Sequence, residues 1–115
     1  MTLEIVLNDF QQKVNANVRI KSIINNWNPV FFIETSDTDL CYQIKIETGK
    51  IIGITLAVVD DDSALLVRGE QQILENVFSG QLNPLVAYSS GLLEVYGDEA
   101  DKVKLDAVSL VLWGF

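Results

Sequence analysis

The chain has 115 residues, of which 49% are hydrophobic, and it carries a net charge of −8 at neutral pH. This length and apolar content are typical of a single globular domain, residues 1–115, and argue against disorder. The acidic balance, with eight lysines and arginines scattered along the chain, argues against a nucleic-acid-binding surface and against electrostatic docking on an anionic bilayer.

Two amphipathic helices are predicted at the N-terminus. In the first, apolar residues recur at i, i+3, i+4 and i+7 and share one face: Leu3, Val6, Leu7, Phe10 and Val14. The spacing repeats in the second helix, at Ile20, Ile23, Ile24 and Trp27. We expect a break near residues 15–17, and we expect Asn28-Pro29 to end the second helix, because a residue before proline disfavours helical angles.

Four strands are expected next, at residues 30–34, 41–47, 50–58 and 64–68, since these runs are rich in Val, Ile and Phe and are separated by polar turns. Thr48-Gly49 predicts a tight hairpin. The run 41–47 alternates cleanly, as expected for an antiparallel sheet with one wet face. In the run 50–58, alternation predicts two faces, with Ile51 opposite the set Ile52, Ile54, Leu56 and Val58.

Residues 71–98 predict a helix, a short second helix, a strand and the start of another helix. The first helix presents four apolar residues on one side: Ile73, Leu74, Val77 and Phe78. Ser79-Gly80 is expected to end it, Asn83-Pro84 to open the second helix and Ser90-Gly91 to close that helix. A strand then follows at residues 92–96, and Asp98 is positioned to cap the last helix.

The last helix is predicted at residues 99–113. One apolar stripe is expected to face the sheet, at Val103, Ala107, Leu110 and Val111. A second stripe lies on another side of the helix, at Leu105, Val108 and Leu112. A helix that is apolar on nearly all sides must be covered on several of them. The cover could be a bound lipid, a second subunit or a membrane, and the net charge disfavours the membrane.

Several positions within residues 71–98 form one pattern: Ser79-Gly80, Leu82, Pro84, Leu85, Val86, Tyr88, Ser90-Gly91, Leu92, Val95 and Gly97-Asp98. This pattern resembles sterol-carrier-type lipid-transfer domains. The predicted elements and the resemblance together give an α+β fold: N-terminal helices, a five-stranded mostly antiparallel sheet and a C-terminal helix packed on one face. In such domains a tunnel lies between the sheet and the helices. The resemblance implies these ligand-binding wall positions: Phe78, Leu82, Leu85, Val86, Tyr88, Leu92, Val103, Ala107, Val108 and Leu112.

No catalytic residue, metal site or cofactor is predicted. The chain has no histidine, which excludes Ser-His and Cys-His nucleophilic catalysis and imidazole metal sites. The carboxylates of residues 60–62 could hold a cation, but we interpret them as a solvated turn. Glu75 and Glu94 could form an acid–base pair, but we expect Glu75 on the wet side of its helix. Cys41 is interpreted as a small buried hydrophobe.

A few polar side chains have alternative roles. Arg68 could reach a ligand carboxylate, although a strand-end salt bridge is the simpler interpretation. Gln71 follows the same strand end and is a weaker candidate for a polar ligand contact. Each tyrosine could place a hydroxyl at the mouth of an apolar pocket or could simply pack: Tyr42, Tyr88 and Tyr96.

The surplus of apolar residues can fill a solid core, line a lipid-sized cavity or form an oligomer interface. The residues alone favour the solid core, whereas the resemblance favours the cavity. The predicted function is non-enzymatic binding or transfer of an apolar ligand such as a fatty acid, acyl chain, sterol or isoprenoid. The alternative is an interaction or dimerisation module accessory to an enzyme, and a homodimer is one form that such a module could take. A single cysteine and the absence of a signal-like or membrane-spanning run predict a cytoplasmic protein without stable membrane insertion.

Overall fold

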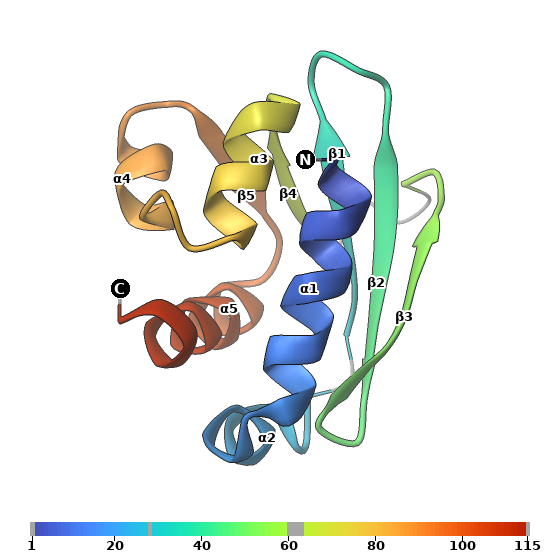
Figure 1. Cartoon of the computed structure of the whole chain (residues 1–115), viewed down its shortest axis with the longest axis vertical. Helices are drawn as coiled ribbons and strands as arrows, with labels where there is room; N and C mark the ends of the chain where they lie inside the picture. Colours follow the sequence, from blue (N-terminus) through green and yellow to red (C-terminus); the bar gives the residue numbers. More distant parts are fainter. Residues whose placement is uncertain (1, 28, 60–63, 115) are drawn as a thin grey trace.

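The computed structural model describes residues 2–27, 29–59 and 64–114 (Figure 1). Two helices open the chain, α1 (Leu3–Ala16) and α2 (Val18–Ile24). Four strands follow, β1 (Val30–Thr35), β2 (Cys41–Glu47), β3 (Lys50–Leu56) and β4 (Leu65–Gly69). The remaining elements are α3 (Gln71–Phe78), α4 (Pro84–Ser89), β5 (Leu93–Tyr96) and α5 (Glu99–Trp113). The expected turn at residues 60–62 lies outside the described residues.

The five strands form one sheet in the order β3-β2-β1-β4-β5. The β1–β4 pair is parallel, and the other three pairs are antiparallel. The two-residue hairpin at Thr48-Gly49 joins β2 to β3, whereas β1 and β4, being parallel, need a longer connection. The predicted α+β class, with a mostly antiparallel sheet, is confirmed.

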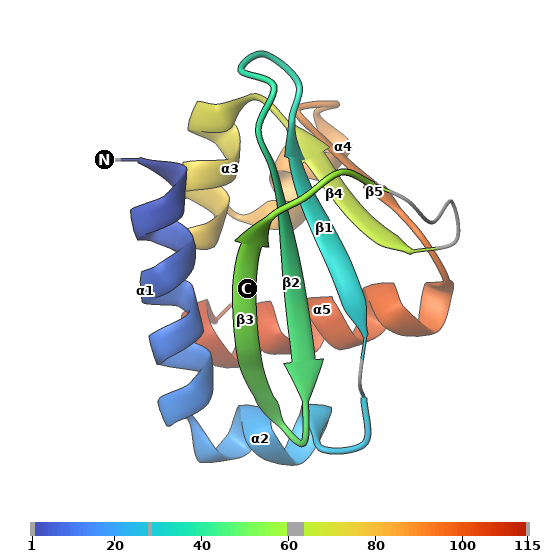
Figure 2. The same cartoon turned by 90° about the vertical axis from the view of Figure 1, so that its right-hand side faces the viewer.

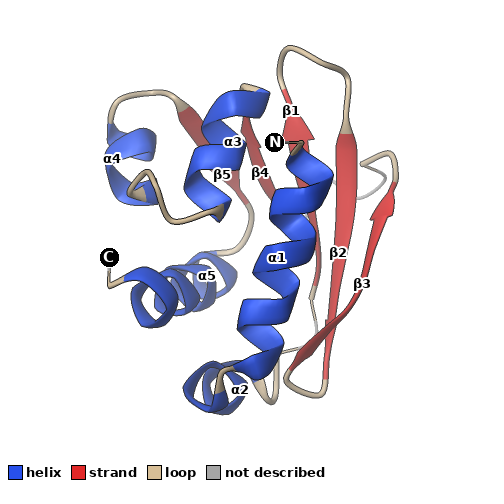
Figure 3. Ribbon diagram, viewed as in Figure 1, coloured by secondary structure: helices blue, strands red, loops and turns tan. Residues whose placement is uncertain are grey.

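The helices gather on one face of the sheet (Figures 1 and 3). Side chains from this face and from α1 and α3 make a continuous apolar core, which includes Leu7, Phe10, Ile33, Ile44 and Leu74. The predicted break between the first two helices is confirmed at Asn17. Its side-chain Oδ1 accepts a hydrogen bond from the Ile20 amide at 3.1 Å, which caps α2.

The opposite face of the sheet carries a charged network. Arg68 donates to Glu34 at 2.9 Å and to Glu94 at 3.2 Å, and its two partners lie beside it in the register of β1 and β5. The salt-bridge interpretation of Arg68 is therefore confirmed. The chain leaving β3 crosses this face (Figure 2), where Phe32 is only 1% exposed although it points away from the helices.

The predicted alternation in β3 is wrong at its start. Ile51 is 2% exposed and Ile52 is 50% exposed, so Ile51, and not Ile52, shares a face with Ile54. The cause is a register shift between Lys45 and Ile46 in the β2–β3 pair. The shift adds one residue to β3, so the side chains on its two sides change faces. Ile54 still packs on the core, so both Ile51 and Ile54 serve the helix-covered face.

The final helix has its predicted bounds but not its predicted orientation. Val103, expected to face the sheet, is 57% exposed, and Leu110 is similarly exposed. One hydrogen bond to α2 and one to Trp27, just after α2, explain the rotation of α5 about its axis. Trp27 Nε1 donates to Asp101 Oδ1 at 2.8 Å, and Lys104 Nζ donates to the Ile23 carbonyl oxygen at 2.8 Å. With Asp101 and Lys104 held in this way, Val103 and Leu110 face solvent, whereas Val111 of the same predicted stripe packs on the core.

Candidate functional site

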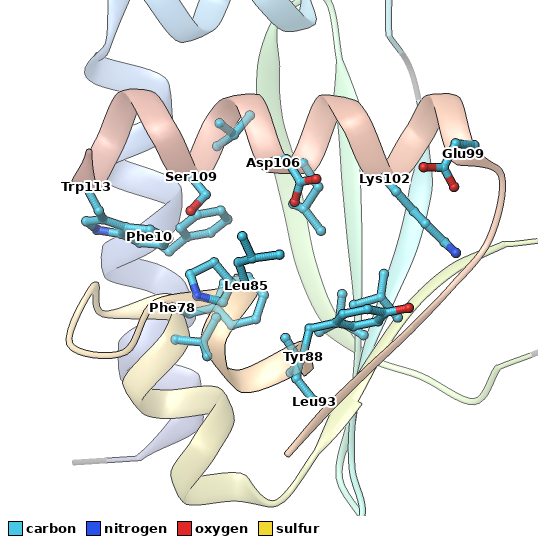
Figure 4. A pocket seen from close by; sticks show the side chains of 16 residues that line it. Phe10, Phe78, Leu85, Tyr88, Leu93, Glu99, Lys102, Asp106, Ser109 and Trp113 are labelled. Carbon is cyan, nitrogen blue, oxygen red and sulfur yellow. The ribbon is translucent and has the colours of Figure 1, made fainter. Parts of the chain in front are cut away.

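A cavity of about 200 Å³ lies beneath α5, and α1, α3, α4, β4 and β5 contribute the rest of its wall (Figure 4). Most of its lining is apolar: Phe10, Val67, Val77, Phe78, Pro84, Leu85, Tyr88, Leu93, Val95, Leu105, Val108 and Trp113. The remaining lining residues are polar and all come from one helix, α5: Glu99, Lys102, Asp106 and Ser109.

Turns at both ends of α4 place its side chains at the rim of this cavity. Gly80 ends α3 with φ +83°, and Gly91 follows α4 with φ +78°, both in the left-handed region that favours glycine. Asn83 caps α4 by accepting a hydrogen bond from the Leu85 amide at 2.9 Å, and Pro84 occupies the first helical position. These predicted turns are confirmed, and they hold Leu85 and Tyr88 at the rim.

An aromatic cluster closes one end of the cavity. The Phe10 ring meets Phe78 edge to face at a centroid distance of 5.1 Å, and it lies 5.9 Å from Trp113. The Trp113 indole also packs on Gly80, where a Cβ atom would overlap its ring. This glycine is therefore needed for close approach as well as for its backbone angle. The Trp113 Nε1 atom is buried and has no acceptor among the described residues.

The polar residues of α5 are spaced three, four and three positions apart, which places them on one stripe of the helix. Figure 4 shows Lys102, Asp106 and Ser109 directed from α5 toward the cavity. Partial burial, together with the charge of Glu99, raises the pKa of Asp106, although this side chain keeps contact with solvent. An apolar cavity with polar groups along one wall can hold an apolar ligand and orient its polar end.

The structure brings together four of the ten predicted wall positions. Phe78, Leu85, Tyr88 and Val108 line the cavity. The other six lie outside its lining: Leu82, Val86, Leu92, Val103, Ala107 and Leu112. Leu112 packs on the core instead, while Val86 and Val103 are exposed. Ligand binding by any of these residues remains a prediction.

Other polar candidates lie away from the cavity. Glu75 is buried, contrary to the expectation of a wet position, and it accepts a hydrogen bond from Gln71 Nε2 at 2.9 Å. Gln71 thus makes a helix contact and does not line the cavity. Tyr42 is buried in the core, and Tyr96 donates to Glu94 on the opposite face of the sheet. Cys41 is half-buried rather than buried, and burial, with the nearby Glu34 charge, raises the pKa of its thiol.

Sequence reasoning missed the polar stripe and the aromatic cluster. A signal was present, because residues 99, 102, 106, 109 and 113 keep the three-and-four spacing of one helix face. Asp98 also differs from expectation. It stands at the N-cap of α5, but its side chain makes no capping hydrogen bond.

A second hollow of about 160 Å³ lies where β4 and β5 end, and its lining includes Arg68, Glu70, Leu92 and Glu94. Since Arg68 is already paired with two carboxylates, this hollow offers no free cation to a ligand carboxylate. Among the described residues there is no cluster of three or more His, Cys, Asp or Glu that could hold a metal ion. Nor does any helix within residues 2–27, 29–59 and 64–114 have the length and apolar character needed to cross a membrane.

The architecture of this chain recurs in proteins of known structure. No family model and no curated protein matches the sequence. Among solved structures, sterol carrier protein 2 matches with a TM-score of 0.68 at 13% identity, over 93% of this chain and 92% of that one. A palmitated sterol carrier protein 2-like protein from Aedes aegypti matches at 0.62 and 16% identity, over 95% of both chains. The chain has the sterol-carrier fold.

The sterol-carrier fold of this chain also recurs inside a larger enzyme. A sec-alkyl sulfatase matches with a TM-score of 0.74 and 12% identity over 100% of this chain. This chain spans 17% of the length of that sulfatase, so it corresponds to one part of the enzyme. The resemblance seen in the sequence is confirmed at the level of the fold.

Proposed function

We propose that this chain binds a single-chain apolar ligand in the cavity beneath α5, without catalysing a reaction. The observation that carries the proposal is an apolar rim that leads into an apolar cavity. Leu85 and Tyr88 stand at this rim and are more than half exposed, although both belong to the lining. Exposed apolar residues around a concave site favour ligand binding over a solid core.

Burial of the chain supplies the affinity. Each methylene group removed from water contributes about 0.8 kcal/mol, so a dodecyl chain gains on the order of 10 kcal/mol before the cost of association. This term has no direction, and we therefore expect the site to accept several kinds of alkyl chain. The palmitated neighbour has the same fold, which supports a long alkyl chain as the buried part of the ligand.

The size of the cavity favours a flexible chain over a rigid sterol. Its volume of about 200 Å³ lies below the roughly 300–1,000 Å³ of typical small-molecule pockets. A flexible chain can enter part of the way and cover the exposed rim with the remainder. A rigid four-ring sterol would require the wall to open.

A matched pair of leucines tests the proposal. Leu85 lines the cavity and is 68% exposed, whereas Leu110 is 59% exposed but lies on the outer side of α5. We expect Leu85→Ser to weaken dodecanol binding by about one to two decades, because a leucine contact contributes about 1.5–3 kcal/mol. Leu110→Ser should leave the affinity unchanged. Isothermal titration calorimetry measures both, and equal effects, or no binding by the unaltered protein, would reject the cavity as the site.

A second candidate function is that of an interaction module. The outer stripe of α5 exposes Val103 and Leu110, and the sulfatase match shows that this fold occurs within a larger enzyme. In that role the stripe would contact a partner surface or a second copy of the chain. Light scattering tests self-association: a dimer that Leu110→Ser dissociates, without loss of dodecanol binding, would support this role.

A further inference from the structure

The polar stripe of α5 limits the kind of head group that the ligand carries, and this step rests on the proposed function. An apolar ligand could end in a carboxylate, a hydroxyl or an amine. The polar groups of the lining are the side chains of Glu99, Lys102, Asp106 and Ser109 on α5, together with the Tyr88 hydroxyl and the buried Trp113 Nε1 donor. The charges of the first three decide which end fits.

Those three charges sum to −1. Lys102 lies three residues after Glu99 and four before Asp106, so a carboxylate stands next to it on each side along the same helix face. A ligand carboxylate that approached Lys102 would also approach two like charges. The whole chain adds to this bias, with a net charge of −8.

Asp106 has acceptor capacity to spare. Among the described residues, neither its carboxylate nor the Lys102 ammonium forms a side-chain hydrogen bond or an ion pair. The Asp106 side chain points from the middle of α5 toward the cavity, and it lies between Lys102 and Trp113 along this helix (Figure 4). An ionised carboxylate in this position accepts hydrogen bonds and has none to donate.

We infer that the cavity selects apolar ligands whose head group donates a hydrogen bond and carries no negative charge, with Asp106 as the acceptor. Long-chain amines and alcohols belong to this class, and ionised fatty acids do not. A protonated amine gains both a charge-assisted hydrogen bond and the attraction of Glu99. An alcohol gains the hydrogen bond alone.

Three ligands with the same dodecyl chain test the inference: dodecylamine, dodecanol and laurate. At pH 7.5 and low salt we expect dodecylamine to bind at least about fivefold tighter than laurate, the size of effect expected for adjacent unit charges near a surface. Asp106→Asn should reduce this ratio several-fold, and Lys102→Gln should increase it. Dodecanol is the uncharged reference, and Asp106→Asn should weaken its binding less than that of dodecylamine, because the asparagine Oδ1 still accepts a hydrogen bond.

Glu70→Gln is the control for overall charge. Glu70 is exposed at the N-cap of α3, makes no side-chain capping hydrogen bond and lies outside the lining of the cavity. The Glu70→Gln substitution alters the net charge by the same amount as Asp106→Asn and should leave the ratio of the dodecylamine and laurate affinities unchanged. An equal shift in both variants, or tighter binding of laurate than of dodecylamine, would overturn the inference while the proposed function stands. If none of the three ligands binds, the proposed function fails and the inference fails with it.

Discussion

The first and last helices, α1 and α5, differ in which of their side chains they bury. In α1, the buried residues are all apolar and the charged residues are exposed, while Gln11 and Asn15 hydrogen-bond the Ile51 backbone of β3. In α5, apolar Val103 and Leu110 face solvent, whereas Lys102 and Asp106 face the cavity. The comparison shows that an apolar stripe in the sequence does not by itself identify the buried face of a helix when neighbouring elements hold that helix in another rotation.

The largest expected effect concerns matched leucines on these two helices. Leu7 in α1 is fully buried, so Leu7→Ala should lower the free energy of unfolding by about 2–5 kcal/mol through lost contacts and a residual cavity. Leu110→Ala should change it by less than about 0.5 kcal/mol, as for most exposed sites. Urea denaturation measures both. A comparable loss at Leu110 would mean that the outer stripe of α5 is covered.

Two glycines beside the cavity separate backbone strain from steric overlap. Gly91 has φ +78° and open space around it, so Gly91→Ala should cost about 1–2 kcal/mol from the left-handed conformation alone, and Gly91→Val more than ~1 kcal/mol. Gly80→Ala carries the same backbone cost and also overlaps the Trp113 ring, so it should cost more. Thermal unfolding monitored by circular dichroism compares the variants. Equal melting temperatures for Gly80→Ala and Gly91→Ala would show that Trp113 moves freely.

The hydrogen bond between Trp27 and Asp101 is expected to fix the rotation of α5. Trp27→Phe removes the Nε1 donor and leaves Asp101 without that partner, so we expect a loss of about 1–3 kcal/mol. Dodecanol affinity should fall as well, because the wall formed by α5 becomes less fixed. Calorimetry with dodecanol beside urea denaturation measures both effects. Loss of stability with unchanged affinity would show that the bond supports the fold but not the cavity.

The smallest expected effect is a pH dependence of stability that arises at Asp106. Its pKa is raised above the ordinary value of 3.8, so the folded state binds this proton more tightly than the unfolded state does. The resulting stability is present below pH 3.8 and is lost as the pH rises through the raised value. Asp106→Asn should therefore gain stability relative to the unaltered protein over that interval. Urea denaturation across acidic pH checks the sign, and a constant difference would contradict the shift.

Local patterns in the sequence predict most of the fold. Glycine and proline mark the turns around α4, and helical spacing identifies α1 and the bounds of α5. The errors arise where contacts with residues distant in the sequence determine which way a side chain faces. The register shift between Lys45 and Ile46 places Ile51, and not Ile52, on the helix-covered face. This shift cannot be recognised in the sequence of one strand alone. The resemblance to sterol-carrier-type domains implies part of the cavity wall, at Leu85 and Tyr88 among others, and the turn residues hold α4 in place beside it.

The rotation of α5 was not predictable from its own residues, because it depends on contacts with α2. Asp101 and Lys104 look like ordinary surface charges in the sequence. Their hydrogen bonds reach residues 74 and 81 positions earlier in the chain, a separation that no local pattern reports. Once α5 is fixed in this way, its polar stripe faces the cavity.

These same hydrogen bonds bear on how the chain reaches its native state. Contacts between α2 and α5 close a loop of more than 70 residues, and the parallel pairing of β1 with β4 closes another long segment. Loop closure on this scale costs entropy before the contacts repay it, so native structure of this kind forms more slowly than a bundle of local contacts. During synthesis, α2 and the aromatic end of the core can therefore complete their contacts only after α5 has left the ribosome. Until then the apolar side of the sheet is incompletely covered, which is the interval in which the growing chain is most open to aggregation.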